Sequence, residues 1–321
     1  MEYMVSCLFV VFDVSREPLV LRPLLTHLFF KRVSCEEDGN AGYVWQVDPA
    51  GIREGEKTIL VDETGDWESF AYYLDTANNR IEFFITHDAK DGALVRYVPS
   101  GPNNNNGVYE NLEWNLLHDS GGGGGGTRTY LKLISEDINE DDLIVTGVFE
   151  WVSNKDDANP EEMYPNVEGI DVVDDMIYFV SKEYKALYVL NITSQSFTIT
   201  STESGAFDKK PDQVQRLLLS SSNGGDRNDD NKDNNGILYF CEDGDNDCGL
   251  HGRDSTNQFF SLISDSTYKT ETTGLAFSPD GMILLLSFQG EEDDEGVIWK
   301  FWREDGYPFN GAFVDIKYHE K

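Results

Sequence analysis

Four acidic residues begin or immediately precede short segments that are rich in Val, Ile, Leu, Phe and Tyr, the composition of β-strands. Each of these segments is followed by a turn and a second strand, so the acids share one place in a repeated pattern. If the repeats surround an axis, the acids converge on it; they are Glu68, Glu168, Asp212 and, less well aligned, Glu271. Carboxylates gathered in a desolvated channel repel one another unless protons or a cation offset their charge.

A second group of acids follows the second strand of two repeats, on loops expected to reach the same region. It comprises Asp88, beside His87, and the pair Glu242 and Asp243. Hard oxygen ligands at this density suit calcium better than zinc. Residues 243–247 also alternate acids as a calcium loop does, although the glutamate that closes an EF-hand loop is missing. The sequence therefore predicts metal ligands among Glu68, Asp88, Glu168, Asp212, Glu242, Asp243 and Glu271.

A structural alternative stays open for each acid, because an acid at the entry to a strand also caps a turn. Arg253 follows on the same repeat as Glu242 and could hold a phosphate beside the metals, or it could form an ordinary ion pair. The sequence has no Gly-x-Ser-x-Gly elbow, Cys-x-x-Cys pair or His-Glu-x-x-His segment. Serine hydrolase, thiol redox and zincin chemistry therefore lack support.

The clearest repeat runs from residue 168 to residue 202 and contains four expected strands, at 169–173, 176–181, 186–191 and 196–202. Similar units open near residues 68, 212 and 273, and helical periodicity is absent. Four-stranded antiparallel meanders in tandem are typical of propeller blades. We expect an all-β propeller of six blades, the first incomplete, over residues 39–321, with 1–38 as a leader or poorly defined N-terminal segment.

The composition is strongly acidic, with 25 basic and 59 acidic residues, a net charge of −34 and a pI near 4.2. Such a field repels nucleic acid and anionic membranes. It is compatible both with a highly charged soluble surface and with bunched cation ligands. The sequence contains no apolar run long enough to span a membrane and no clear signal peptide, and we expect a monomer. Cys241 and Cys248 could form a disulfide across a hairpin or remain two thiols.

Several segments resemble the PhoX-like family, β-propeller proteins named for the PhoX-type alkaline phosphatases, and in particular its eukaryotic and cyanobacterial branch. They are 168–171 (Glu-Gly-Ile-Asp), 178–182 (Tyr-Phe-Val-Ser-Lys), 204–207, 211–213, 238–244 and 271–281. The resemblance covers residues 40–320. It implies a phosphomonoesterase that uses calcium and iron held by channel-facing carboxylates and a cysteine, and that is usually exported. By position it assigns metal binding to Glu68, Glu168, Glu242 and Glu271, whereas the match of Cys241 to the iron-binding cysteine is left open.

Residues 274–281 also resemble the gluconolactonase and strictosidine-synthase-like propellers, which centre on one calcium, although Thr273 stands where those proteins have Asn. The sequence thus favours a metal-dependent phosphoesterase that acts on a small phosphorylated substrate. The alternatives are a non-catalytic, calcium-stabilised interaction scaffold and a lactonase-like hydrolase with a single calcium. An extracellular or secretory location is implied by the resemblance.

Overall fold

The computed structural model describes residues 6–9, 32–37, 41–48, 54–75, 80–100, 117–118, 125–139, 144–218, 236–244, 248–264, 271–290, 296–310 and 318–319. In this part of the chain the regular structure is antiparallel β-sheet, together with a 3₁₀ turn, Lys155–Asp157, and one helical turn, α1 (Pro160–Met163). None of the described helices is long and apolar enough to cross a membrane.

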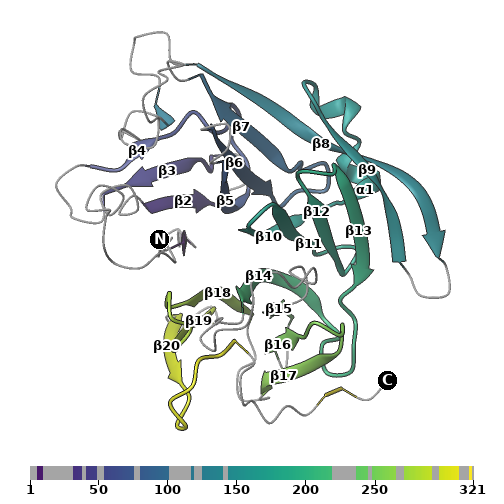
Figure 1. The fold of residues 1–321 in the computed structure, drawn as a ribbon. Helices are drawn as coiled ribbons and strands as arrows, with labels where there is room; N and C mark the ends of the chain where they lie inside the picture. Colours follow the sequence, from purple (N-terminus) through teal and green to yellow (C-terminus); the bar gives the residue numbers. More distant parts are fainter. Residues whose placement is uncertain are drawn as a thin grey trace, which may run out of the picture.

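The strands form four sheets (Figure 1). The first sheet contains β1 (Ser6–Phe9), β2 (Arg32–Glu36), β3 (Val44–Val47) and β4 (Glu56–Lys57). The third contains β14 (Lys210–Leu218), β15 (Gly236–Asp243), β16 (Gly249–Arg253) and β17 (Phe259–Ser264). The fourth contains β18 (Thr272–Phe277), β19 (Ile283–Phe288) and β20 (Val297–Trp302).

The second sheet joins two blades into nine strands in the order β10-β11-β12-β13-β9-β8-β7-β6-β5. One blade is β5 (Trp67–Asp75), β6 (Arg80–His87), β7 (Val95–Pro99) and β8 (Gly126–Asn139); the other is β10 (Val167–Val173), β11 (Met176–Ser181), β12 (Ala186–Asn191) and β13 (Ser196–Ser201). Between them β9 (Ile144–Val152) pairs with β8 on one side and β13 on the other. Because β5 and β10 also contact each other, this sheet nearly closes on itself.

The first strand of every sheet or blade lies on the inside. These strands contact one another in the order β1, β5, β10, β14 and β18, and β18 contacts β1 again (Figure 1). The described residues therefore form a propeller of five meanders, where six were expected, because the ring closes after the fifth. In the first sheet, β1 and β2 pair with each other and β2 pairs with β3; the domain boundary expected after residue 38 stays a prediction.

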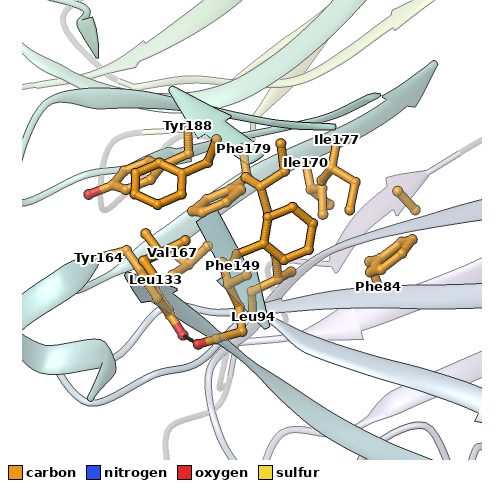
Figure 2. Packing of buried hydrophobic residues seen from close by; sticks show 14 of the residues in the cluster. Phe84, Leu94, Leu133, Phe149, Tyr164, Val167, Ile170, Ile177, Phe179 and Tyr188 are labelled. Carbon is orange, nitrogen blue, oxygen red and sulfur yellow. Dashed lines mark hydrogen bonds between the residues drawn. The ribbon is translucent and has the colours of Figure 1, made fainter. Parts of the chain in front are cut away.

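Strands in the middle of the molecule are buried on both faces, as a propeller requires. In β11 the alternation sends Ile177 and Phe179 into one hydrophobic cluster, and Tyr178 and Val180 into another. The rings of Phe179 and Tyr188 stack with centroids 4.6 Å apart. Figure 2 shows this first cluster, where aromatic side chains of neighbouring strands fill the space between two blades. Packing of this kind fixes the inner strands that carry the polar residues described next.

Candidate metal centre on the inner strands

Four inner strands share a register irregularity at the same place. The pairing with the second strand shifts between Trp67 and Phe70 in β5, and at the equivalent points of β10, β14 and β18. A bulge breaks the strict alternation of side chains and re-aims the extra residues. The residues inside the shifts are Glu68 and Ser69, Glu168 and Gly169, Asp212 and Gln213, and Gly274 and Leu275.

Three of these residues form what we call the carboxylate triad: Glu68, Glu168 and Asp212. One oxygen of each lies within 4.8 Å of the others, and all three side chains are buried. The close approach depends on Gly169, because a Cβ there would lie 2.5 Å from Gln213 Cα and 2.6 Å from Val214 N. The structure thus brings together three acids that the sequence placed at the start of successive repeats. In β18 the equivalent bulge position is Gly274, which carries no carboxylate.

Hydrogen bonds satisfy only part of the triad. Gln213 Nε2 donates to Glu68 Oε1 at 2.6 Å, and Ser69 Oγ donates to Gln213 Oε1 at 3.1 Å. By contrast, Asp212 Oδ2 is buried and has no hydrogen-bond partner among the described residues, although the Asp212 side chain also interacts with Thr273 and Glu271. A buried acceptor without a donor is costly unless a cation or a proton serves it.

A lysine lies directly beside the triad. Lys182 Nζ is 2.8 Å from Glu168 Oε1, and 3.3 Å from both Asp88 Oδ2 and Asp243 Oδ2. These three neighbours of the ammonium group come from three consecutive blades. Asn166 Nδ2 donates to Asp88 Oδ1 at 2.8 Å and holds that carboxylate in place. We call this arrangement the Lys182 cage.

The negative charge of the centre exceeds what one lysine offsets. Burial, and then the charge of Asp88, raises the pKa of Glu168 well above its usual range. Burial and the neighbouring Glu271 raise the pKa of Asp212 in the same way, and burial and Asp243 raise the pKa of Glu271 to about 7. Burial alone would lower the pKa of Lys182, but Glu168 and Asp88 outweigh it and raise that pKa. The centre therefore favours additional positive charge, supplied by protons or by a cation.

Glu242 lies in a different environment from the triad. Its Oε1 accepts the backbone N–H groups of Asp208 and Lys209, at 3.1 and 2.8 Å. Its Oε2 accepts the N–H of Gly249 at 3.2 Å and lies 3.0 Å from His251 Nε2. Both oxygens are thus occupied by groups that hold the turn of its blade together, and a metal-binding role for Glu242 stays a prediction.

Arg253 is buried and bound between two neighbouring blades. Its Nη1 donates to Thr200 Oγ1 of β13 at 2.9 Å, and its Nη2 donates to Asn257 Oδ1 at 2.8 Å. The guanidinium also lies over the Phe259 ring, 5.6 Å from its centroid. The sequence singled out Arg253 as a phosphate ligand, and that role stays a prediction; these contacts join the third blade of the ring to the fourth.

Neither cysteine of this blade belongs to the carboxylate triad. Cys241 packs in a hydrophobic cluster with Tyr239 and Leu250, on the opposite face of β15 from Glu242. Cys248 forms no disulfide, and its Sγ lies 2.8 Å from the Gly244 carbonyl oxygen. Burial raises the pKa of the Cys248 thiol to about 12. Of the alternatives left open by the sequence, the structure has two thiols. Residues 245–247 of the expected calcium loop lie outside the described part of the chain.

Sequence reasoning missed Lys182, Gln213 and Ser69. The signal for Lys182 was its place in the repeat: Trp67 pairs with His87, Val167 with Ser181 and Pro211 with Glu242. The residues that follow those partners, Asp88, Lys182 and Asp243, are therefore equivalent, and Lys182 is the basic member of an otherwise acidic set. Gln213 and Ser69 could not be found from the strand pattern, because only the bulge turns them inward.

Comparisons with known proteins find similarity among solved structures. No protein-family model and no curated protein sequence matches the chain. Among solved structures it is similar to Pseudomonas fluorescens PhoX in complex with vanadate, a transition state analogue, with a TM-score of 0.60 and 14% sequence identity. The match covers 83% of this chain and 58% of that structure, so this chain spans less than two thirds of its length. At this identity the likeness establishes the propeller fold.

Proposed function

We propose that this chain is a metal-dependent phosphoesterase of the PhoX-like type that acts on a small phosphorylated substrate. The observation that carries the proposal is the carboxylate triad, in which three buried acids from successive blades meet and one oxygen of Asp212 has no hydrogen-bond partner among the described residues. The shared fold with PhoX, which was solved with a transition state analogue, supports the choice of phosphoryl chemistry.

The residues present fit a hard divalent cation. The ligand atoms on offer are carboxylate oxygens, which calcium prefers, and sulfur and imidazole ligands are absent from the triad. Glu68, Glu168 and Asp212 would hold the ion, and Asp212 Oδ2 would gain a partner where the described residues provide none. A cation bound there would offset phosphate charge and polarise a phosphoryl oxygen. Iron belongs to the proposal only through the family resemblance.

The chain's own residues would position the substrate. Gln213 fixes the orientation of Glu68, and Ser69 in turn fixes Gln213. Lys182 is the cation nearest the triad among the groups described above, so we assign to its ammonium group the contact with phosphoryl oxygens. We prefer it to Arg253, because Lys182 contacts Glu168 of the triad directly, whereas the guanidinium group of Arg253 bonds to Thr200 and Asn257.

The test is hydrolysis of para-nitrophenyl phosphate by the purified chain, before and after chelation and after calcium or iron is returned. We expect turnover that chelation abolishes and metal restores, and that Glu168→Gln lowers by at least about 100-fold, as loss of a major electrostatic contributor does. Glu203→Gln, which changes an exposed acid paired with Lys185, serves as the matched control and should retain activity. Turnover that is unaffected by chelation and by Glu168→Gln would refute the proposal.

A non-catalytic scaffold is the second candidate, and one observation favours it. Lys182 already provides a positive charge within the cluster, and a proton shared by Asp212 and Glu271 would provide another. A propeller whose acids are neutralised in this way needs no metal to fold. Absence of both bound metal and turnover would support this candidate, and a single bound calcium with lactone hydrolysis would support the lactonase alternative.

A further inference from the structure

Lys182 lies at a position where the two neighbouring blades have an aspartate. Asp88, Lys182 and Asp243 follow equivalent positions at the end of the second strand of three consecutive blades. Two aspartates and one lysine at equivalent positions of a ring place the ammonium group between the two carboxylates, 3.3 Å from each. The repeat therefore creates a position that suits a cation, and the ammonium group of Lys182 occupies it.

The Lys182 cage is held from several directions. The backbone N–H of Lys182 donates to the Asn166 carbonyl at 2.9 Å, and the side chain of Asn166 donates to Asp88. The side chain of Lys182 is mostly buried, with 18% of its surface exposed, so its ammonium cannot simply swing into water without breaking three ion pairs. This is a built position and not a chance surface contact.

Glu168 belongs to both the carboxylate triad and the Lys182 cage. An ammonium group 2.8 Å from Glu168 Oε1 competes for that carboxylate with any ion that the triad takes. Two cations that share one carboxylate in a buried site repel each other strongly, because little water screens them.

We propose that Lys182 is the resident counter-ion of the centre and sets its affinity for divalent cations by competing for Glu168. A cation that enters the triad displaces the ammonium group from Glu168, and Asp88 and Asp243 retain it. The inference rests on the proposed function in that it takes the triad to be the cation site. It adds that occupancy is opposed by a side chain of the protein, so that only a sufficiently concentrated or strongly bound divalent ion is accepted.

The test is calorimetric titration of calcium into chelator-treated wild type, Lys182→Met and Lys182→Arg. Removing the competing charge should tighten calcium binding by at least about tenfold in Lys182→Met, whereas Lys182→Arg should stay within about threefold of wild type. Lys185→Met is the matched control, because Lys185 lies in the same turn but pairs with exposed Glu203. We also expect Lys182→Met to melt at a lower temperature than wild type in chelator. Its melting temperature should rise more than that of wild type when calcium is added.

The outcomes separate this inference from the proposed function. If wild type binds calcium and Lys182→Met binds it no more tightly, the inference fails and the metal site stands. If only Lys182→Met binds calcium, the inference stands and the metal dependence of the wild type fails. If neither binds, both fail. Should Lys182→Met not fold even with calcium, Lys182→Gln decides in its place, because its amide can hydrogen-bond to the same oxygens without the charge.

Discussion

Glu168 and Glu242 are both buried acids on neighbouring blades, yet their surroundings are opposite. Glu242 accepts three backbone N–H groups and bonds to His251. Glu168 faces two other carboxylates and one lysine. In the first arrangement both carboxylate oxygens have partners that hold a turn, while the second arrangement leaves negative charge in excess. A buried carboxylate thus indicates a cation site only when backbone donors do not already satisfy it.

The largest loss of stability is expected when Glu242 is replaced. Glu242→Ala should lower the free energy of unfolding by about 3–5 kcal/mol, because three backbone donors and His251 lose their acceptor in a buried site. Denaturant unfolding measures this, with Glu203→Ala as an exposed control that should remain near wild type. A variant of full stability would show that Glu242 is not the structural member of the pair.

Gly169→Ala tests the packing that brings the triad together. The added methyl group would press on the backbone of Gln213 and Val214, so we expect a loss of about 1–3 kcal/mol in unfolding free energy, together with weaker calcium binding. Gly125→Ala is the control, since nothing lies within 4 Å of a Cβ at that position. Equal stability and equal calcium affinity in both variants would mean that the close approach of β10 and β14 is not required.

Arg253→Met tests whether Arg253 stabilises the contact between two blades or binds substrate. Loss of the contacts with Thr200 and Asn257 should cost about 1–2 kcal/mol of unfolding free energy. The KM for para-nitrophenyl phosphate should not change, because we expect Lys182, and not Arg253, to contact the substrate. A raised KM in a variant of normal stability would return Arg253 to the role that the sequence suggested.

The smallest stability effect is expected for Glu168→Gln. Because burial and Asp88 raise the pKa of Glu168, the cost of burying its charge offsets much of what the ion pair with Lys182 contributes. A neutral side chain of the same shape should therefore change stability in chelator by no more than about 1 kcal/mol. The rise in melting temperature on adding calcium should disappear. Thermal denaturation with and without calcium checks both statements, and a severe loss of stability in chelator would place Glu168 in the same class as Glu242.

The repeat pattern was enough to predict the fold and the meeting of three of the four acids expected to converge. A strand-turn-strand unit headed by an acid places Glu68, Glu168 and Asp212 at equivalent positions, and equivalence around a ring means proximity. The number of blades was not predictable in the same way, because the β8–β9 hairpin joins two blades edge to edge and adds a strand that belongs to neither meander.

The finer structure of the centre depends on features with weak sequence signals. The alternation of apolar residues in the sequence does not reveal a bulge. That Ser69 and Gln213 turn inward is therefore seen only from the strand pairing in the structure. The sequence also gave Glu242 and Glu168 equal weight, since what distinguishes them is the direction of backbone N–H groups from residues 208, 209 and 249. Lys182 was overlooked because a lysine in a polar loop is usually a solvated residue.

The central claim is that the carboxylate triad binds a divalent metal ion. The most direct measurement is the metal content of the purified chain by mass spectrometry, after chelation, reloading with calcium and removal of free ion, for wild type and Glu168→Gln side by side. We expect wild type to retain calcium in stoichiometric amount and Glu168→Gln to lose it. Equal retention by the two proteins, or no retention by wild type, would contradict it.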